Sequence, residues 1–149
     1  MKKLLFILVA ILSLCACSSS DDDSRSANVT NQFVYDGKSY PIDKALIHSR
    51  GVTLYSGDKY TLEVYNCDFE TGKKNYLSAF EYAEAGIFIY LENGSQDYEY
   101  IWGFKNINES SYVTIKKNDD DNRTYIEAYI NDGKKTIKAT YLGTPKIEE

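Results

Sequence analysis

The stretch from Arg123 to Leu142 decides the fold of this chain. It consists of RTYIEAYI (residues 123–130), the turn dipeptide Asp132-Gly133 and TIKATYL (residues 136–142). In its first half, apolar residues alternate with others: one face carries Ile126, Ala128 and Ile130, and the other carries Tyr125, Glu127 and Tyr129. This period of two is typical of a strand with one buried face, and Asp-Gly favours a tight hairpin turn. We therefore predict an antiparallel hairpin over 123–142.

The rest of the chain repeats this pattern in short segments. We expect further strands at 32–35, 38–47, 59–67, 75–82, 87–92, 98–104 and 112–116, with turns at Asp36-Gly37, Ser56-Gly57-Asp58 and Asn93-Gly94. Pro41 fits only near a sheet edge or a bulge. The chain has 14 tyrosines, which are strong strand formers, and no segment has a convincing helical pattern. The predicted fold is all-β: an antiparallel meander that forms a β-sandwich or a calycin-like barrel.

The N-terminus has the pattern of a lipoprotein signal. A basic start, Met1-Lys2-Lys3, precedes an apolar run over 4–14 that is too short to cross a bilayer as a helix. The sequence Leu14-Cys15-Ala16-Cys17 then matches a lipobox, with Cys17 as the acylated residue. Cleavage before Cys15 is disfavoured because it would put Leu14 where the peptidase requires a small residue. The alternative is a plain secretory signal with coincidental cysteines.

These features divide the chain into four parts. We expect a signal peptide at 1–16, an acylated cysteine and flexible acidic tether at 17–31, one β domain at 32–145 and a disordered tail at 146–149. The serines and aspartates after Cys17 cannot bury apolar area, which is why a tether is expected there.

The leader resembles those of the surface lipoproteins of Bacteroidota. In those proteins an acidic run after the acylated cysteine directs export, and Ser20, Asp21, Asp22 and Asp23 match that position. The resemblance implies a lipid-anchored protein of the outer membrane that faces the cell exterior. In addition, 33–42 and 125–143 look like the first and last hairpins of small Bacteroidota lipoproteins with an all-β domain of unassigned function. This second resemblance implies a sandwich or calycin-like barrel and brings no catalytic residues.

The charge of the chain argues against a nucleic-acid partner, and its cysteine content argues against an internal disulfide. Without Lys2 and Lys3, 15 basic side chains face 22 acidic ones, a formal charge of −7, so nucleic acid is not an expected partner. Cys67 is the only thiol left after acylation of Cys17 and loss of Cys15, so no internal disulfide can form, and we expect Cys67 to be buried and inert.

No catalytic or metal motif stands out. His48 is the only histidine, and no nucleophile motif surrounds any serine. One histidine and one cysteine are too few for zinc. The acidic loop 118–122, with Asp119 and Asp121, is a weak calcium candidate that lacks the ligand spacing of known calcium loops. A glycosidase needs two facing carboxylates, which sequence alone cannot pair among Glu63, Glu81, Glu92, Glu99 and Glu127. We expect no cofactor.

Aromatic residues are the best binding candidates. At period two, one face of the 98–104 strand carries Tyr98, Tyr100, Trp102 and Phe104. This row is either a platform for sugar rings or part of the core, and the core is favoured because a helix-free domain needs large residues inside. Tyr125 and Tyr129, which flank Glu127 opposite an aliphatic face, are the better candidates for exposed tyrosines.

The leading hypothesis is a cell-surface lipoprotein whose β domain is a non-catalytic binding or interaction module. It would contact the membrane through its lipid and bind a glycan or another surface protein. The alternatives are a glycan-binding accessory lipoprotein that uses surface aromatics, and a small carboxylate-dependent hydrolase.

Replacing the lipid-accepting thiol tests the leader. Cys17→Ser should abolish acylation, because the hydroxyl cannot form the thioether link, and should leave the protein unprocessed or soluble. Fatty-acid labelling and membrane fractionation measure this. Deletion of Asp21, Asp22 and Asp23 is the comparison variant: it should keep the anchor and reduce cleavage by external protease. Membrane anchoring that persists in Cys17→Ser would contradict the lipobox.

Overall fold

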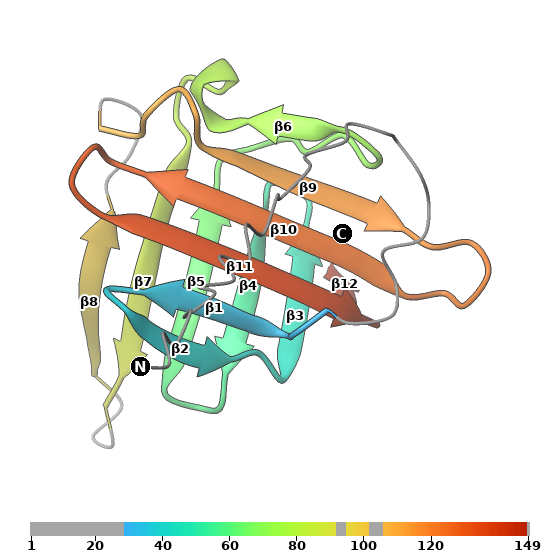
Figure 1. Ribbon diagram of the computed structural model, residues 1–149, viewed down its shortest axis with the longest axis horizontal. Coiled ribbons are helices and arrows are strands. Elements are labelled where there is room, and N and C mark those ends of the chain that lie inside the picture. Colours follow the sequence, from blue (N-terminus) through green and yellow to red (C-terminus); the bar gives the residue numbers. More distant parts are fainter. Residues whose placement is uncertain (1–28, 92–94, 102–105, 149) are drawn as a thin grey trace, which may run out of the picture.

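Two six-stranded sheets stack face to face in the computed structural model, which describes residues 29–91, 95–101 and 106–148 (Figure 1). Sheet I has the order β2 (Lys38–Pro41), β1 (Gln32–Tyr35), β11 (Thr136–Gly143), β10 (Thr124–Asn131), β9 (Tyr112–Lys117) and β6 (Lys74–Tyr76). Sheet II has the order β12 (Lys146–Glu148), β3 (Lys44–His48), β4 (Gly51–Ser56), β5 (Tyr60–Tyr65), β7 (Glu84–Tyr90) and β8 (Gln96–Ile101). The strands of the two sheets cross one another (Figure 1).

The all-β prediction is confirmed, and of its two forms the fold is the sandwich rather than the closed barrel. The predicted hairpin is β10 and β11, which pair from Thr124 opposite Gly143 to Asn131 opposite Thr136. Along β10 buried and half-buried residues alternate without a break, so Ile126, Ala128 and Ile130 face the core as predicted. The Asp36-Gly37 turn is also confirmed: both residues have positive φ, at 48° and 72°, and connect β1 to β2.

The order of strands in each sheet departs from a simple meander. Strand β1 pairs with β11, β6 pairs with β9, and β12 runs parallel to β3. The chain starts in sheet I, forms β3, β4 and β5 of sheet II, and crosses to sheet I for β6. It then forms β7 and β8 of sheet II and returns to sheet I for β9, β10 and β11, before β12 joins the edge of sheet II. Pro41 lies in the edge strand β2, where its missing N–H costs no ladder bond.

The core lies between the sheets and is built from aliphatic side chains with a few aromatic ones. The largest fully buried residues are Phe33, Leu54, Leu62, Leu77, Ile126, Ile130 and Ile137. Tyr40 stacks on Phe33 with ring centroids 4.8 Å apart, and Tyr60 packs against Tyr40 at 4.9 Å.

Cys67 is fully buried, as predicted, and its Sγ donates to the carbonyl of Tyr65 at 3.1 Å. Burial raises the pKa of the thiol to about 12, which leaves it protonated and unreactive at neutral pH.

Four differences from the predictions go beyond a shift of one to three residues at a strand end. The expected strand 38–47 divides into β2 and β3, because the chain changes sheets at Ile42 and Asp43. The expected strand 75–82 is only the short β6 followed by a 3₁₀ turn over Leu77–Ala79. The central strand β4 was not predicted at all. The tail expected to be disordered from 146 forms β12, held by pairing with β3.

The folded region also begins before the predicted start at residue 32. Asn31 forms two hydrogen bonds with the backbone of Leu142: its side-chain NH₂ donates to the carbonyl at 3.1 Å, and its side-chain oxygen accepts from the N–H at 2.7 Å. The carbonyl of Thr30 accepts from the hydroxyl of Thr140 at 2.7 Å. These bonds fix the end of the expected tether to β11.

A comparison of two isoleucines distinguishes the stability that comes from core packing from the stability that comes from strand propensity. Ile126 is 0% exposed and Ile147 is 71% exposed, although both lie in strands. Ile126→Ala should lower the free energy of unfolding by about 2–5 kcal/mol, through lost burial and the cavity that remains. Ile147→Ala, the matched control, should change it by no more than about 0.5 kcal/mol. Urea unfolding measures both, and equal effects would contradict the assignment of the core.

Candidate functional site

The outer face of sheet I carries a cluster of tyrosines around one carboxylate. Tyr125, Glu127 and Tyr129 project from β10 on the side away from the core, as predicted from the sequence. Strand β9 adds Tyr112, which lies directly opposite Tyr129, and β6 adds Tyr76 opposite Tyr112. We call these four tyrosines and Glu127 the tyrosine face.

Glu127 is the polar centre of the tyrosine face. Its Oε1 accepts a hydrogen bond from the hydroxyl of Tyr112 at 2.9 Å, and its Oε2 accepts one from the hydroxyl of Tyr125 at 3.2 Å. Both carboxylate oxygens therefore have a donor from a tyrosine. These bonds fix the orientation of two rings relative to the acid.

The rings of the tyrosine face contact one another. Tyr112 and Tyr129 are stacked, with centroids 5.9 Å apart and planes 28° from parallel. Tyr76 meets Tyr112 edge-on at 6.3 Å, and its side chain is 48% exposed. The result is a continuous aromatic surface that runs across β6, β9 and β10.

Lysines border this aromatic surface. The Nζ of Lys74 lies 4.0 Å from the centre of the Tyr112 ring, a cation–π contact. Lys116 is opposite Tyr125 in the β9–β10 pair, and Lys138 is opposite Tyr129 in the β10–β11 pair. All three lysines are exposed. The tyrosine face thus has positive charge at its margin, although the chain as a whole is acidic.

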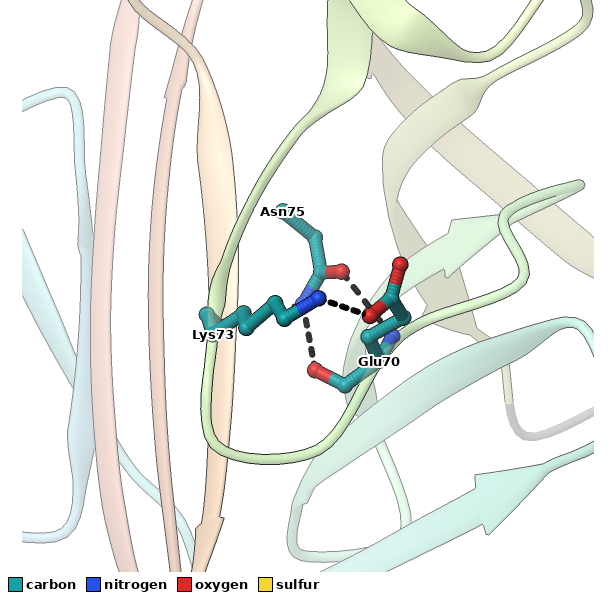
Figure 2. Close-up of polar contacts among 3 residues, drawn as sticks. All are labelled: Glu70, Lys73 and Asn75. Carbon is teal, nitrogen blue, oxygen red and sulfur yellow. Dashed lines mark hydrogen bonds and ion pairs between the residues drawn. The ribbon is translucent and has the colours of Figure 1, made fainter.

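A buried asparagine holds β6 in place (Figure 2). The side-chain NH₂ of Asn75 donates to the carbonyls of Glu70, Lys73 and Val113 at 3.0, 3.1 and 3.3 Å, and its side-chain oxygen accepts from the N–H of Glu70 at 2.9 Å. Lys73 and Glu70 form an ion pair at the same turn. Because Asn75 points inward between Lys74 and Tyr76, fixing it directs both neighbours to the outer face.

The electrostatics of the tyrosine face change the acidity of Tyr112. Burial, the hydrogen bond to Glu127 and the charge of Glu127 raise the pKa of Tyr112 to about 12 from an ordinary 10.0. The phenol is held in its neutral, donating form. The tyrosine face therefore offers a ligand aromatic rings for stacking, tyrosine hydroxyl groups, the Glu127 carboxylate as an acceptor, and lysine ammonium groups at its edge.

The sequence predicted three of the five residues of this cluster, Tyr125, Glu127 and Tyr129. Tyr112 was inside a predicted strand, but nothing in the sequence showed that this strand pairs with 124–131. Tyr76 was not a candidate, because the segment 75–82 was expected as one long strand and its pattern did not show which face Tyr76 would occupy. The period-two placement of Tyr112 with Thr114 and Lys116 was the available signal.

The aromatic row predicted at 98–104 is only partly described. Tyr98 lies in β8 opposite Phe88, with ring centroids 6.5 Å apart, and is 54% exposed. The preference for a core position is therefore wrong for Tyr98, because β8 is an edge strand and Tyr98 lies on its outer side. Tyr100 belongs to β8, but its side chain lies outside the described part, as do Trp102 and Phe104.

The structure gives the calcium candidate no support. Asp121 binds Arg123 instead: its Oδ2 lies 2.6 Å from the guanidinium, and its Oδ1 accepts from the backbone N–H at 3.0 Å. These bonds lower the pKa of the Asp121 carboxyl. Asp119 is exposed in the same loop. Within residues 29–91, 95–101 and 106–148, no group of three His, Cys, Asp or Glu side chains is placed to hold a metal ion.

The remaining candidates are scattered. His48 ends β3 and lies against the turn at Gly51. Glu63 lies on the outer face of sheet II, Glu81 is exposed after the 3₁₀ turn, and Glu92 and the side chain of Glu99 lie outside the described residues. Cys17, Ser20, Asp21, Asp22 and Asp23 also lie outside them.

Comparison of the chain with protein-family models, curated proteins and solved structures gives no match. In the part of the chain that the structure describes, no helix has the length and apolar character needed to span a bilayer.

The Glu127 contacts predict the alkaline behaviour of Tyr112. The raised pKa means that folding favours the neutral phenol, so this contribution to stability is complete below about pH 10 and is lost as the pH rises toward 12. Subtracting the ultraviolet tyrosinate titration of Tyr112→Phe from that of the native chain should leave one ionisation near pH 12. A difference centred near pH 10 would contradict the hydrogen bond to Glu127. Tyr82→Phe, at an exposed tyrosine away from the face, is the control.

Proposed function

We propose that this protein is a lipid-anchored outer-membrane protein of the cell surface whose β-sandwich is a non-catalytic binding module. The lipobox ending at Cys17 and the acidic run after it support the location. Thr30 and Asn31 bond to β11, so in this proposal the chain that leads from the anchor meets the sandwich at sheet I. The tyrosine face is the binding surface in this proposal.

The ligand class that the tyrosine face favours is a glycan. Stacked and edge-on tyrosine rings offer flat surfaces to the C–H faces of sugar rings, while Glu127, tyrosine hydroxyls and three lysines offer hydrogen bonds to hydroxyl groups. The single observation that carries this proposal is the continuous aromatic surface held in place by Glu127. Such a fixed array loses little conformational entropy when a ligand binds.

The hydrolase alternative has less support from the geometry. A glycosidase needs two carboxyl groups about 5–10 Å apart on either side of one bond. Among the described residues, Glu127 and Glu63 are the strand glutamates held by tyrosine hydroxyls, and they lie on opposite outer faces of a sandwich whose sheets pack about 10 Å apart. They cannot contact the same glycosidic bond.

Truncation of two tyrosines tests the binding surface. Tyr76→Ala and Tyr112→Ala should each weaken binding to a retained polysaccharide by about tenfold, because a central aromatic contact commonly contributes 1–2 kcal/mol. A glycan array identifies the polysaccharide, and affinity electrophoresis followed by calorimetry measures the loss.

Tyr82→Ala is the matched control, since Tyr82 is an exposed tyrosine outside the tyrosine face. It should bind like the native chain. If the two face variants keep their fold by circular dichroism and also keep native affinity, the tyrosine face is not the site. If the folded native chain binds no glycan, the ligand is not a glycan.

A further inference from the structure

A pocket opens on the outer face of sheet II, on the opposite side of the sandwich from the tyrosine face. Its volume is about 510 Å³, within the range of small-molecule sites. It is lined by Asp43, Lys44, Tyr55, Asp58, Thr61 and Tyr90. These residues come from β3, β4, β5 and β7, from the link between β2 and β3, which holds Asp43, and from the turn that joins β4 to β5.

Two of the lining residues, Thr61 and Tyr90, contact the carboxylate of Glu63, which is not itself part of the lining. Thr61 is on the outward side of β5 but is only 1% exposed, and its hydroxyl donates to Oε1 of Glu63 at 2.9 Å. The hydroxyl of Tyr65 donates to Oε2 of Glu63. The hydroxyl of Tyr90 makes a longer contact of 3.5 Å with Oε1. Glu63 is thus surrounded by three hydroxyl donors.

The pairing of β7 with β5 shows where the side chain of Tyr90 lies. Its backbone N–H donates to the carbonyl of Lys59 at 2.8 Å, while its hydroxyl reaches Glu63, four residues further along the neighbouring chain. The Tyr90 side chain therefore extends along β5 past Thr61, which explains why Thr61 is buried on an outer face. Tyr55 lies directly opposite Thr61 on β4 and bounds the other side.

The mouth of the pocket carries charged groups. Oδ2 of Asp43 accepts from the N–H of Gly57 at 3.0 Å, which ties the start of β3 to the β4–β5 turn. The Nζ of Lys44 lies 4.7 Å from the centre of the Tyr55 ring. Asp58 is exposed in the turn. Burial and the charge of Glu63 raise the pKa of Tyr55, so its phenol stays neutral and able to donate.

We propose that this pocket is a second binding site, for one or two sugar rings that carry no acid group. Tyr55 and Tyr90 supply aromatic surfaces, Asp43 and Asp58 accept from ring hydroxyls, and Lys44 donates. In the lining, the two carboxylates of Asp43 and Asp58 outnumber the one lysine, Lys44, and repel uronic acids. The site is separate from the tyrosine face and does not depend on the function proposed for it.

Titration of the full domain with free sugars tests the pocket. Glucose and N-acetylglucosamine are added in the millimolar range and followed by two-dimensional amide NMR. At least one of them should shift the amide signals of Gly57, Asp58 and Thr61, and glucuronic acid should not. Asp58→Asn and Lys44→Ala should each weaken binding by about tenfold, since each removes a charged hydrogen-bonding group.

Asp119→Asn is the control for Asp58→Asn, because Asp119 is also an exposed aspartate in a hairpin loop and lies outside the pocket. It should bind like the native chain, as should Tyr76→Ala. Absence of shifts with both sugars, unchanged affinity in the two pocket variants, or equal binding of glucuronic acid would each overturn the proposal. Shifts confined to the tyrosine face would overturn it while supporting the proposed function.

Discussion

Pairing between β1 and β11 is the interaction on which the rest of the sandwich depends. It places Phe33 opposite Ala139 and Tyr35 opposite Ile137, so residues from both ends of the domain meet in one core. Asn31 reinforces it by bonding to Leu142, 111 positions away. All of sheet II except β12 is built from chain between these partners. Closing so long a segment costs entropy, which the buried aromatic and aliphatic contacts of β1 must offset.

On the outer faces of both sheets, a tyrosine covers the sheet and bonds to a glutamate. A two-sheet sandwich buries one side of each sheet and leaves the other to water. On β10, Tyr125 and Glu127 are two residues apart and share the outer side, and on β5 Glu63 and Tyr65 have the same spacing. In each case the ring covers the sheet and the hydroxyl donates to the carboxylate. Tyrosine thus covers the outer side of each sheet with a ring whose polar end is hydrogen-bonded.

Local patterns in the sequence predicted many of the strands and turns of this fold. They did not predict which strands that are distant in the sequence pair with each other. Alternation in 124–131 and the Asp36-Gly37 turn depend on neighbouring residues, which is why both were predicted. Strand β4 was missed because five of its six residues are buried, so it lacks alternation. Strand β12 was missed because three residues, two of them charged, become a strand only through pairing with β3. Tyr112 joined the candidate site only once the partner of its strand was known.

The contacts of the two half-buried glutamates on the outer faces support the proposal that this sandwich is a binding module. Glu127 and Glu63 each accept from hydroxyl groups at both oxygens, so their acceptor directions are set before any ligand arrives. An acid engaged in this way is a well-oriented hydrogen-bond partner. Because the surrounding rings are fixed to the same acids, stacking and hydrogen-bonding groups keep a constant spacing. In the proposed binding module, a rigid array of this kind would select ligands by shape and hydroxyl pattern.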